Sequence, residues 1–381
     1  MDCREQCWGS NARGQLGDGT MGSAFAPSAV AVTGAVELAA GILHTCARLA
    51  SGKVMCWGGG AHGQLGNGAQ APSETPVEVK GLVDAIALGA GQLRSCAVRK
   101  DGSAQCWGAN VDGALGTGSP DAAALVPATV AGNKALAVPA VGHVFTCFLA
   151  QDATVWCAGK LPTAAGQTTA NLVLAKVVGL AEIVALLASD EHACALKKTG
   201  ELLCWGDNGF EQLGTGNTDP SEVPKMVVGK SDFVFAATAT DHSCGVAGNK
   251  SAWCWGAGAF GQLATGKVDD SGVPVAASPL AGATMLATGF RFTCFKDAAA
   301  VLKCVGTNGT GQLGADLPDK TKLVPAAVKG VGGVKQIVAG HSHACALSTT
   351  GQVSCWGASD EGAVGNGKAL VFTPVTALGL P

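Results

Sequence analysis

The chain has 381 residues, of which 48% are hydrophobic, 14% are charged and 56 are glycine, and its formal net charge is −3 at pH 7. The charge and the absence of any run of Lys or Arg argue against nucleic acid as a partner, and no stretch reaches the 18 or so uninterrupted apolar residues of a membrane span. Abundant glycine among short apolar runs is typical of an all-β protein with many turns.

The first 34 residues contain half of a unit that is complete elsewhere. Cys7-Trp8-Gly9 and Gly14-Gln15-Leu16-Gly17 are followed by a loop and by the strand-like run Pro27–Val32. Cys3 and Cys7 lie four residues apart and have no partner at the spacing that the other cysteines share. We expect them to bond to each other in a small local loop.

From His44 to Gly58 two β-prone runs flank a turn, and each run carries one cysteine. Counting inward from Cys46 and Cys56 leaves three residues for the loop, with Gly52 where a three-residue hairpin needs a positive φ. This register places the two cysteines opposite each other on one face of an antiparallel pair, at disulfide distance.

The same ten-residue spacing recurs along the whole chain, and the first cysteines of successive pairs are about 50 residues apart. We therefore predict seven disulfide hairpins, one in each copy of a repeat. The predicted bonds join Cys46 to Cys56, Cys96 to Cys106, Cys147 to Cys157, Cys194 to Cys204, Cys244 to Cys254, Cys294 to Cys304 and Cys345 to Cys355.

Each complete unit reads as four short strands. In the first unit these are 36–39, 45–49, 54–57 and 77–79, with a Gly-Gln-Leu-Gly turn at 63–66 and a proline-containing loop before the last strand. Four antiparallel strands repeated seven times describe the blades of a β-propeller. The unit around Cys157 lacks the turn motif, so its loop is expected to differ.

Two motifs carry a family resemblance that covers essentially the whole chain. The first is Trp-Gly-x-Asn-x-x-Gly-Gln-Leu-Gly-x-Gly followed by Pro and a Val-rich strand, and the second is Ala-Gly-x-x-His-x-Cys-Ala-Leu. Together they resemble the repeat of the regulator of chromosome condensation family, and the paired cysteines resemble its disulfide-rich, exported bacterial members. The resemblance implies a seven-bladed propeller.

The count of units leaves the N-terminal segment open. Residues 35–381 are predicted to form one propeller of seven repeats, and 1–34 to be a closure or assembly segment. The alternative is eight blades, of which the N-terminal one is incomplete. The half-unit then either contributes to that blade, covers the closure seam or offers strands to another molecule.

The cysteines also bear on the compartment. No Cys-x-x-Cys occurs, so structural disulfides are favoured over zinc or redox chemistry. Regular pairing favours an oxidising location, extracellular, on the cell surface or periplasmic. The start of the chain, Met1–Glu5, has no apolar signal core, so we expect that a secretion signal has been removed; reduced cysteines in a cytosol are the alternative.

Two other recurring residue types admit a functional reading. Histidines lie two residues before the first cysteine in four units, where a Cys–His metal pair is conceivable, but the other units have Arg94, Phe145 and Phe292 there, so hydrogen bonds between blades are favoured. Tryptophan after the second cysteine is interpreted as packing between blades. The residues are His44, His192, His242 and His343, and Trp8, Trp57, Trp107, Trp205, Trp255 and Trp356.

No catalytic motif is found, and we expect no enzyme activity, no cofactor and no bound metal. The predicted function is protein binding or scaffolding, through the variable loops before the fourth strands or self-assembly through residues 1–34. These loops carry the acidic candidates Glu74, Asp121, Asp219, Glu222, Asp269, Asp270, Asp316 and Asp319.

The resemblance adds two alternatives. The first is guanine-nucleotide exchange on a small GTPase, which requires a cytosolic location and reduced cysteines. The second is inhibition of a secreted enzyme, as in a bacterial propeller that blocks β-lactamase. An inhibitor needs aromatic anchors, and the loops between the Gly-Gln-Leu-Gly turn and the proline-containing fourth strand offer only Phe25 and Phe372.

Overall fold

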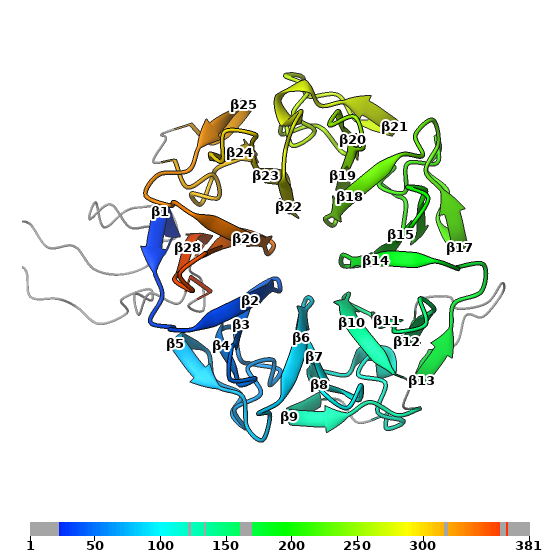
Figure 1. Ribbon diagram of the computed structural model, residues 1–381, viewed down its shortest axis with the longest axis vertical. Helices are drawn as coiled ribbons and strands as arrows, with labels where there is room; N and C mark the ends of the chain where they lie inside the picture. The colour runs from blue at the N-terminus through cyan, green and yellow to red at the C-terminus, as the bar shows by residue number, and fades with distance from the viewer. Residues whose placement is uncertain are drawn as a thin grey trace, which may run out of the picture.

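Seven antiparallel sheets of four strands stand as blades around a central axis (Figure 1). This computed structural model describes residues 23–120, 123–132, 135–160, 170–315, 319–358 and 363–364. The predicted seven-bladed propeller is confirmed, and the alternative of eight blades is wrong. Within the described ranges no helix is long and apolar enough to cross a membrane.

The strands of a blade are called A to D from the axis outward. Blades one to three are β2 (Ala35–Ala40), β3 (His44–Leu49), β4 (Val54–Gly58) and β5 (Ser73–Glu78); β6 (Ala85–Ala90), β7 (Arg94–Arg99), β8 (Ala104–Ala109) and β9 (Ala123–Thr129); and β10 (Leu136–Val141), β11 (Phe145–Ala150), β12 (Val155–Gly159) and β13 (Asn171–Lys176).

Blades four to seven follow in the same order. They are β14 (Ile183–Ala188), β15 (His192–Lys197), β16 (Leu202–Gly206) and β17 (Ser221–Met226); β18 (Phe233–Thr238), β19 (His242–Ala247), β20 (Ala252–Gly256) and β21 (Ser271–Ala276); β22 (Met285–Gly289), β23 (Phe292–Lys296), β24 (Leu302–Thr307) and β25 (Thr321–Ala327); and β26 (Val334–Ala339), β27 (His343–Ser348), β28 (Val353–Ala358) and β1 (Ser23–Ala29). Short 3₁₀ turns lie at Val111–Gly113 and Ser278–Leu280.

The central hairpin of each blade has the register that the cysteine spacing predicts. Cys46 pairs directly with Cys56 in the β3–β4 ladder, and Gly52 has a φ of 88° in the connecting turn. The same direct pairing recurs in the other six blades, so the two cysteines of every hairpin face each other across the ladder.

All seven predicted disulfides are present, with Cα atoms 4.0 to 4.1 Å apart. Cys3 and Cys7, which were expected to bond to each other, lie outside the described residues. The observed bonds join Cys46 to Cys56, Cys96 to Cys106, Cys147 to Cys157, Cys194 to Cys204, Cys244 to Cys254, Cys294 to Cys304 and Cys345 to Cys355.

The fourth strands begin earlier than the sequence suggested. In blade one the predicted strand was 77–79, but β5 spans Ser73–Glu78 and includes Pro76. A proline is compatible with this position because strand D lies at the outer edge of its sheet, where the missing N–H breaks no ladder bond. The N-terminal run is likewise shifted, since β1 spans Ser23–Ala29 rather than 27–32.

Blade seven combines the two ends of the described chain. β1 pairs antiparallel with β28 and supplies the outermost strand of a sheet whose other strands come from the last repeat. In Figure 1 the two strands lie side by side, β1 in blue and β28 in red. Through this pairing every blade reaches four strands.

The hydrophobic core lies between the blades. Each of seven buried clusters draws side chains from two consecutive blades; one of them joins Cys46, Cys56 and Leu65 of blade one to Leu88 and Trp107 of blade two. A single blade therefore leaves both of its apolar faces exposed, and only the closed ring buries them all.

We expect removal of one disulfide, by Cys46→Ser together with Cys56→Ser, to lower the free energy of unfolding by about 2–3 kcal/mol, because the crosslink closes a loop of about ten residues in the unfolded chain. Urea unfolding followed by tryptophan fluorescence measures this value, with the fully disulfide-bonded protein as reference. An unchanged unfolding midpoint would show that the staple does not contribute to stability.

Candidate functional site

The propeller has two faces of different construction. Because neighbouring strands are antiparallel, the A–B and C–D loops open on one side of the disc, here called the loop face, and the B–C hairpins and D–A connections open on the other, the hairpin face. On the loop face the backbone N–H after strand C bonds to the A–B loop of its own blade, as from Gly59 to the carbonyl of Leu43 at 2.7 Å. The two sets of loops therefore form one continuous surface.

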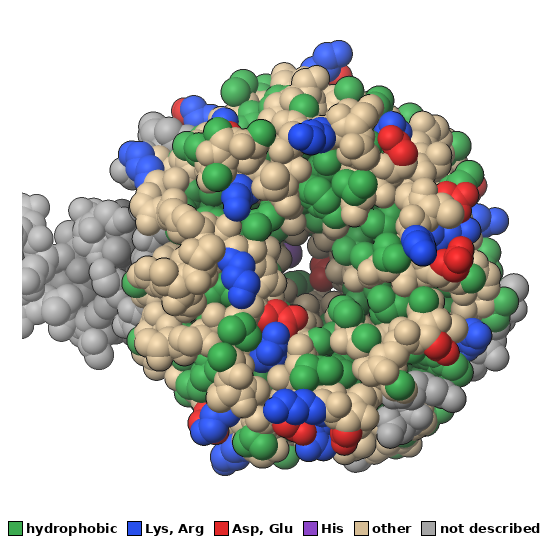
Figure 2. All heavy atoms as spheres, viewed as in Figure 1, with side chains coloured by type: hydrophobic (Ala, Val, Ile, Leu, Met, Phe, Trp, Pro, Cys, Tyr) green, Lys and Arg blue, Asp and Glu red, His purple; other side chains and the backbone are tan. Residues whose placement is uncertain are grey.

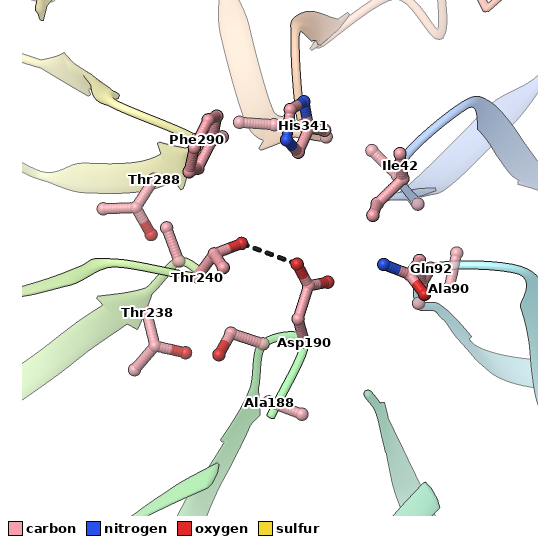
Figure 3. Close-up of a pocket in the computed structure, with 18 of the residues that line it drawn as sticks. Ile42, Ala90, Gln92, Ala188, Asp190, Thr238, Thr240, Thr288, Phe290 and His341 are labelled. Carbon is pink, nitrogen blue, oxygen red and sulfur yellow. Dashed lines mark hydrogen bonds between the residues drawn. The ribbon is translucent and has the colours of Figure 1, made fainter. Parts of the chain in front are cut away.

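A narrow hollow of about 70 Å³ lies where the seven A–B loops meet around the axis (Figure 3). The residue four positions before the first cysteine of each hairpin lies in this loop and is different in nearly every blade, although the strands around it repeat. These residues, here called the mouth residues, are Ile42, Gln92, His143, Asp190, Thr240, Phe290 and His341. All are half-buried, and all except His143 line the hollow.

The mouth is asymmetric because its loops do not all nest equally closely. A Cβ on Gly41 would lie 2.1 Å from the carbonyl oxygen of Gly91, so glycine is required where these two loops touch. Blades four and five have Ser189 and Ala239 at this position. Beside them the carboxylate of Asp190 accepts a hydrogen bond of 2.7 Å from the hydroxyl of Thr240 (Figure 3).

A continuous stack of three rings and one guanidinium group runs from the mouth across the loop face. Phe290 stacks on His341 with centroids 4.3 Å apart, and the Arg291 guanidinium lies 4.4 Å from the centroid of Phe290 and 4.5 Å from that of Phe260. The stack thus links blades five, six and seven. Arg291 has a φ of 64°, a strained conformation for a residue with a side chain. Among the described residues no carboxylate forms an ion pair with it.

Burial sets the charge of the mouth. It lowers the pKa of His341 below its ordinary value, and the carboxylates of Asp190 and Asp241 oppose this effect only in part. The imidazole is consequently neutral at pH 7, and Asp190 is the one acidic side chain among the described residues of the lining.

The acidic residues predicted from the sequence are spread over the C–D loops and fourth strands of several blades. Asp219, Glu222, Asp269 and Asp270 are exposed in blades four and five, as is Asp319 in blade six, and Glu74 is half-buried in blade one. None of these six lines the mouth. The other two candidates, Asp121 and Asp316, lie outside the described residues.

Several of these acids have local partners. Asp270 accepts a hydrogen bond of 2.7 Å from the backbone of Gly258, and Asp319 pairs with Lys322.

Three of the four histidines before the first cysteines bond to the next blade, as predicted. The Nε2 atoms of His44, His242 and His343 lie within 2.8 to 2.9 Å of a hydroxyl on the next blade, that of Ser95, Thr293 and Thr45 respectively. His192 instead bonds through Nδ1 to Ser189 at 2.6 Å, and its Nε2 has no partner among the described residues.

The residue facing each of these positions follows its chemistry. Where the slot holds His or Arg94, the residue at the facing position of the next blade is Ser or Thr. His192 follows this rule with Ser243, although its Nε2 makes no hydrogen bond. Phe145 and Phe292, in contrast, face Ala193 and Ala344 and pack with them in shared cores. The slot therefore serves the joint between blades.

Arg94 fills the same slot with a buried charge. It has no exposed surface, and it donates to the backbone carbonyls of Ala109 and Gly142 at 2.8 and 3.0 Å. Burial lowers its pKa to about 10, so the guanidinium still carries its charge at pH 7. The second of these carbonyls belongs to blade three, so Arg94 also joins two blades.

The predicted packing of tryptophans between blades is confirmed for the described residues. Trp57, Trp107, Trp205, Trp255 and Trp356 have no exposed surface. The indole N–H of Trp107 donates to the carbonyl of Gln64 in the preceding blade at 2.9 Å, and Trp255 does the same with Gln212. The turn motif thus provides the acceptor for the next blade.

In the described part of the chain no three His, Cys, Asp or Glu side chains gather as a metal site requires.

The sequence reasoning missed the ring stack and the mouth. It sought aromatic anchors only between the turn motif and the fourth strand, whereas Phe260 lies directly before the turn motif and Phe290 in an A–B loop. A usable signal was present in the alignment of the repeats. The A–B loop residue four positions before the first cysteine varies among the seven copies, while the cysteine itself is invariant.

The geometry and the repeats define a class: a disulfide-stapled propeller with a variable surface carried on a repeated frame. Two sequence models of the Regulator of chromosome condensation (RCC1) repeat match the chain, one at residues 35–64, 183–212 and 334–363 and the other at 51–98 and 199–246. The protein is thus a seven-bladed β-propeller that contains repeats of the RCC1 type.

Solved structures agree with this fold. Human WBSCR16 aligns with a TM-score of 0.74 at 17% identity, covering 87% of this chain and 89% of that one. Prp20p from Saccharomyces cerevisiae aligns with a TM-score of 0.69 at 18% identity, over 85% and 82%. The ectodomain of the Physcomitrella patens receptor kinase CR4 gives a TM-score of 0.53 at 20% identity, over 84% and 73%. A comparison with curated protein sequences finds no match.

The joint between blades one and two can be exchanged for the kind found between blades three and four. We expect His44→Phe or Ser95→Ala alone to cost about 1–3 kcal/mol of unfolding free energy, since each leaves a buried polar group without its partner. The double variant, which recreates a Phe–Ala joint, should regain most of this loss. A double-mutant cycle by urea unfolding measures the coupling, and strictly additive losses would contradict the proposed pairing rule.

Stability should fall as the pH drops below 6.5. Burial lowers the pKa of His44 to about 3 and those of His192 and His343 to about 4. The unfolded chain therefore binds protons that the folded protein excludes, and each histidine should cost about 2 kcal/mol between pH 6.5 and 5. Urea unfolding across this range tests the slope. The double variant of His44→Phe and Ser95→Ala has one such histidine fewer and should lose less, whereas equal slopes would refute the assignment.

Proposed function

We propose that this propeller is a non-enzymatic protein-binding scaffold of an extracytoplasmic compartment, and that it engages its partner through the loop face. The observation that carries this proposal is the stack of Phe260, Arg291, Phe290 and His341. Aromatic rings and arginine are the residue types that dominate binding energy at protein interfaces. Here four of them lie together at the surface, across three blades.

The stack is also organised in advance of binding. Arg291 is held between two rings, and its backbone carbonyl accepts a hydrogen bond of 2.8 Å from Thr307. The backbone N–H of Phe290 donates to the carbonyl of His341 on the next blade at 3.1 Å. A side chain fixed in this way loses little conformational freedom when it meets a partner. Phe210, which is 48% exposed, lies on the C–D loop of blade four and therefore on the same face.

Ion pairs occur on both faces of the disc, and Asp319 with Lys322 is one on the loop face. Toward the hairpin face Arg48 pairs with Glu37 at 2.6 Å and Arg99 with Asp84 at 2.8 Å. Figure 2 shows basic and acidic side chains mixed around one face of the disc. The guanidinium of Arg291, which forms no ion pair within the described ranges, stands out against these pairs, and it suits a carboxylate of the partner.

The acidic C–D loops remain part of the proposed interface, as the rim around the stack. The seven disulfides support an oxidising location. The solved structures of similar fold include a receptor-kinase ectodomain and Prp20p, whose binding to Gsp1p and histones has been studied. At their level of identity they support the fold alone, so the compartment is inferred from the cysteines.

Affinity capture from the envelope and secreted fractions of the source organism tests the proposal. We expect the double variant of Phe260→Ala and Arg291→Ala to reduce the yield of a specifically captured protein at least tenfold, since both sides of the stack are lost. Quantitative mass spectrometry of the captured proteins gives the readout.

The matched control is Lys53→Ala, which removes an exposed ion pair with Glu78 beside the B–C hairpin of blade one. It should capture the same protein at the wild-type level. Capture that survives loss of the stack but disappears in Lys53→Ala would move the binding surface to the hairpin face and overturn the proposal.

A further inference from the structure

Prolines protect the outer edge of six of the seven blades. In each of these blades strand D contains a proline directly before the residue that faces the second cysteine of the hairpin. A proline has no N–H group, so it hinders the addition of a further strand at an exposed sheet edge. The prolines are Pro27, Pro76, Pro127, Pro224, Pro274 and Pro325.

Blade three is the exception. Its outer strand, β13, has the sequence Asn-Leu-Val-Leu-Ala-Lys, and Leu174 occupies the position of the proline, directly before Ala175, which faces Cys157. Leu174 packs in the core shared with blade two and is 8% exposed. Of the seven fourth strands, β13 is therefore the one in which no proline blocks the outer edge.

The ladder shows where the backbone groups of β13 point. The N–H of Val177 donates to the carbonyl of Val155 at 2.9 Å. Because backbone groups alternate in direction along an antiparallel strand, those of Ala175 also point to strand C, and those of Leu174 and Lys176 point outward. β12 is the strand of the sheet that pairs with β13, and no described residue outside this ladder bonds to Leu174 or Lys176. Their N–H and C=O groups offer four main-chain hydrogen bonds to an added strand.

The start of the same edge is already covered. The backbone N–H of Gly118, in the C–D loop of blade two, donates to the carbonyl of Leu172 at 2.8 Å. Beside this contact the side chains of Leu172 and Val173 are 37% and 45% exposed. An added strand therefore meets aliphatic side chains at this end of its site.

Lys176 lies at the other end of the edge. Its side chain is exposed, and among the described residues it forms no ion pair. Asp152, whose charge acts on Lys176 only at longer range, accepts a hydrogen bond of 2.6 Å from the hydroxyl of Thr154. β13 itself contains no acidic residue, so a second copy of this strand would bring no carboxylate to the lysine. A strand with an acidic residue suits the site better.

We propose that β13 binds an extended segment of a partner protein by strand addition. This segment carries a carboxylate at the residue opposite Lys176 and aliphatic residues beside Leu172, and the backbone of Leu174 and Lys176 provides its hydrogen bonds. The site lies on the outer rim of blade three (Figure 1). It is separate from the ring stack of the loop face, so the proposal does not depend on the function proposed above.

Fluorescence anisotropy with a labelled peptide tests the assignment on the full chain with its disulfides intact. The peptide is the amide Ser-Thr-Glu-Thr-Val-Thr-Val-Ser with the dye at its N-terminus, and its glutamate and valines share one face of a strand. We expect saturable binding of one peptide per chain. Glutamine in place of the glutamate should lower the affinity about threefold, the effect of an exposed cross-strand charge pair, and Lys176→Ala should abolish this difference.

Leu174→Pro introduces the residue of the other six blades, removes the outward N–H, and should lower peptide affinity at least tenfold. The matched control is Leu174→Val, which keeps the N–H and an aliphatic side chain in the same core and should bind as wild type. Near-ultraviolet circular dichroism establishes that both variants are folded. A peptide N-methylated at the valine opposite Leu174 makes the same test on the unaltered protein and should also bind at least tenfold more weakly.

Three results would overturn the proposal: no binding of the peptide, equal binding to the wild type and Leu174→Pro, or equal binding of the N-methylated peptide. A fourth is self-association in sedimentation velocity that Leu174→Pro abolishes, without peptide binding, which would assign the edge to a second copy. The double variant of Phe260→Ala and Arg291→Ala should bind the peptide as wild type, so a failure of this site is distinguishable from a failure of the loop face.

Discussion

Burial between consecutive blades is the constraint on which the structure depends. Each blade has an apolar face on both sides, and the fully buried tryptophans and disulfides lie in clusters that belong to two blades at once. Because the seventh cluster joins blade seven to blade one, every blade has a neighbour on both of its apolar faces. The disulfides act within blades, whereas the ring is held by the contacts between them.

The repeated residues make the contacts between blades, and we therefore expect function to reside in the residues that vary. The tryptophan needs a carbonyl from the preceding turn, and the slot before the cysteine needs a matching hydroxyl or a methyl group on the next blade. The side chains of Asp190 and Phe290 take no part in either of these two contacts. They differ from blade to blade because the fold does not dictate them, and the asymmetry of the mouth follows from this freedom.

The sequence alone predicted the repeated strands and disulfides of the blades, but it did not predict how the surface residues are arranged. The register of Cys46 with Cys56 follows from spacing and turn chemistry alone, and seven repetitions make the inference secure. Pro76 was misplaced because a single chain does not reveal which strand lies at a sheet edge. The contact of Phe260 with Arg291 joins residues of adjacent blades that meet only through the curvature of the closed ring, a quantity that no local pattern encodes. The acidic loops were recognisable as variable, but their order around the axis was not.

The closure of blade seven requires the first and the last strands of the described chain to pair. Ser23 pairs with Ala358, so the strand synthesised first among the described residues docks beside one synthesised last. Until then β28 presents an unpaired edge, and β1 has no sheet to join. The loop-closure entropy of almost the whole chain must be overcome at this one ladder. The seam of blade seven is therefore the ladder whose formation completes the ring.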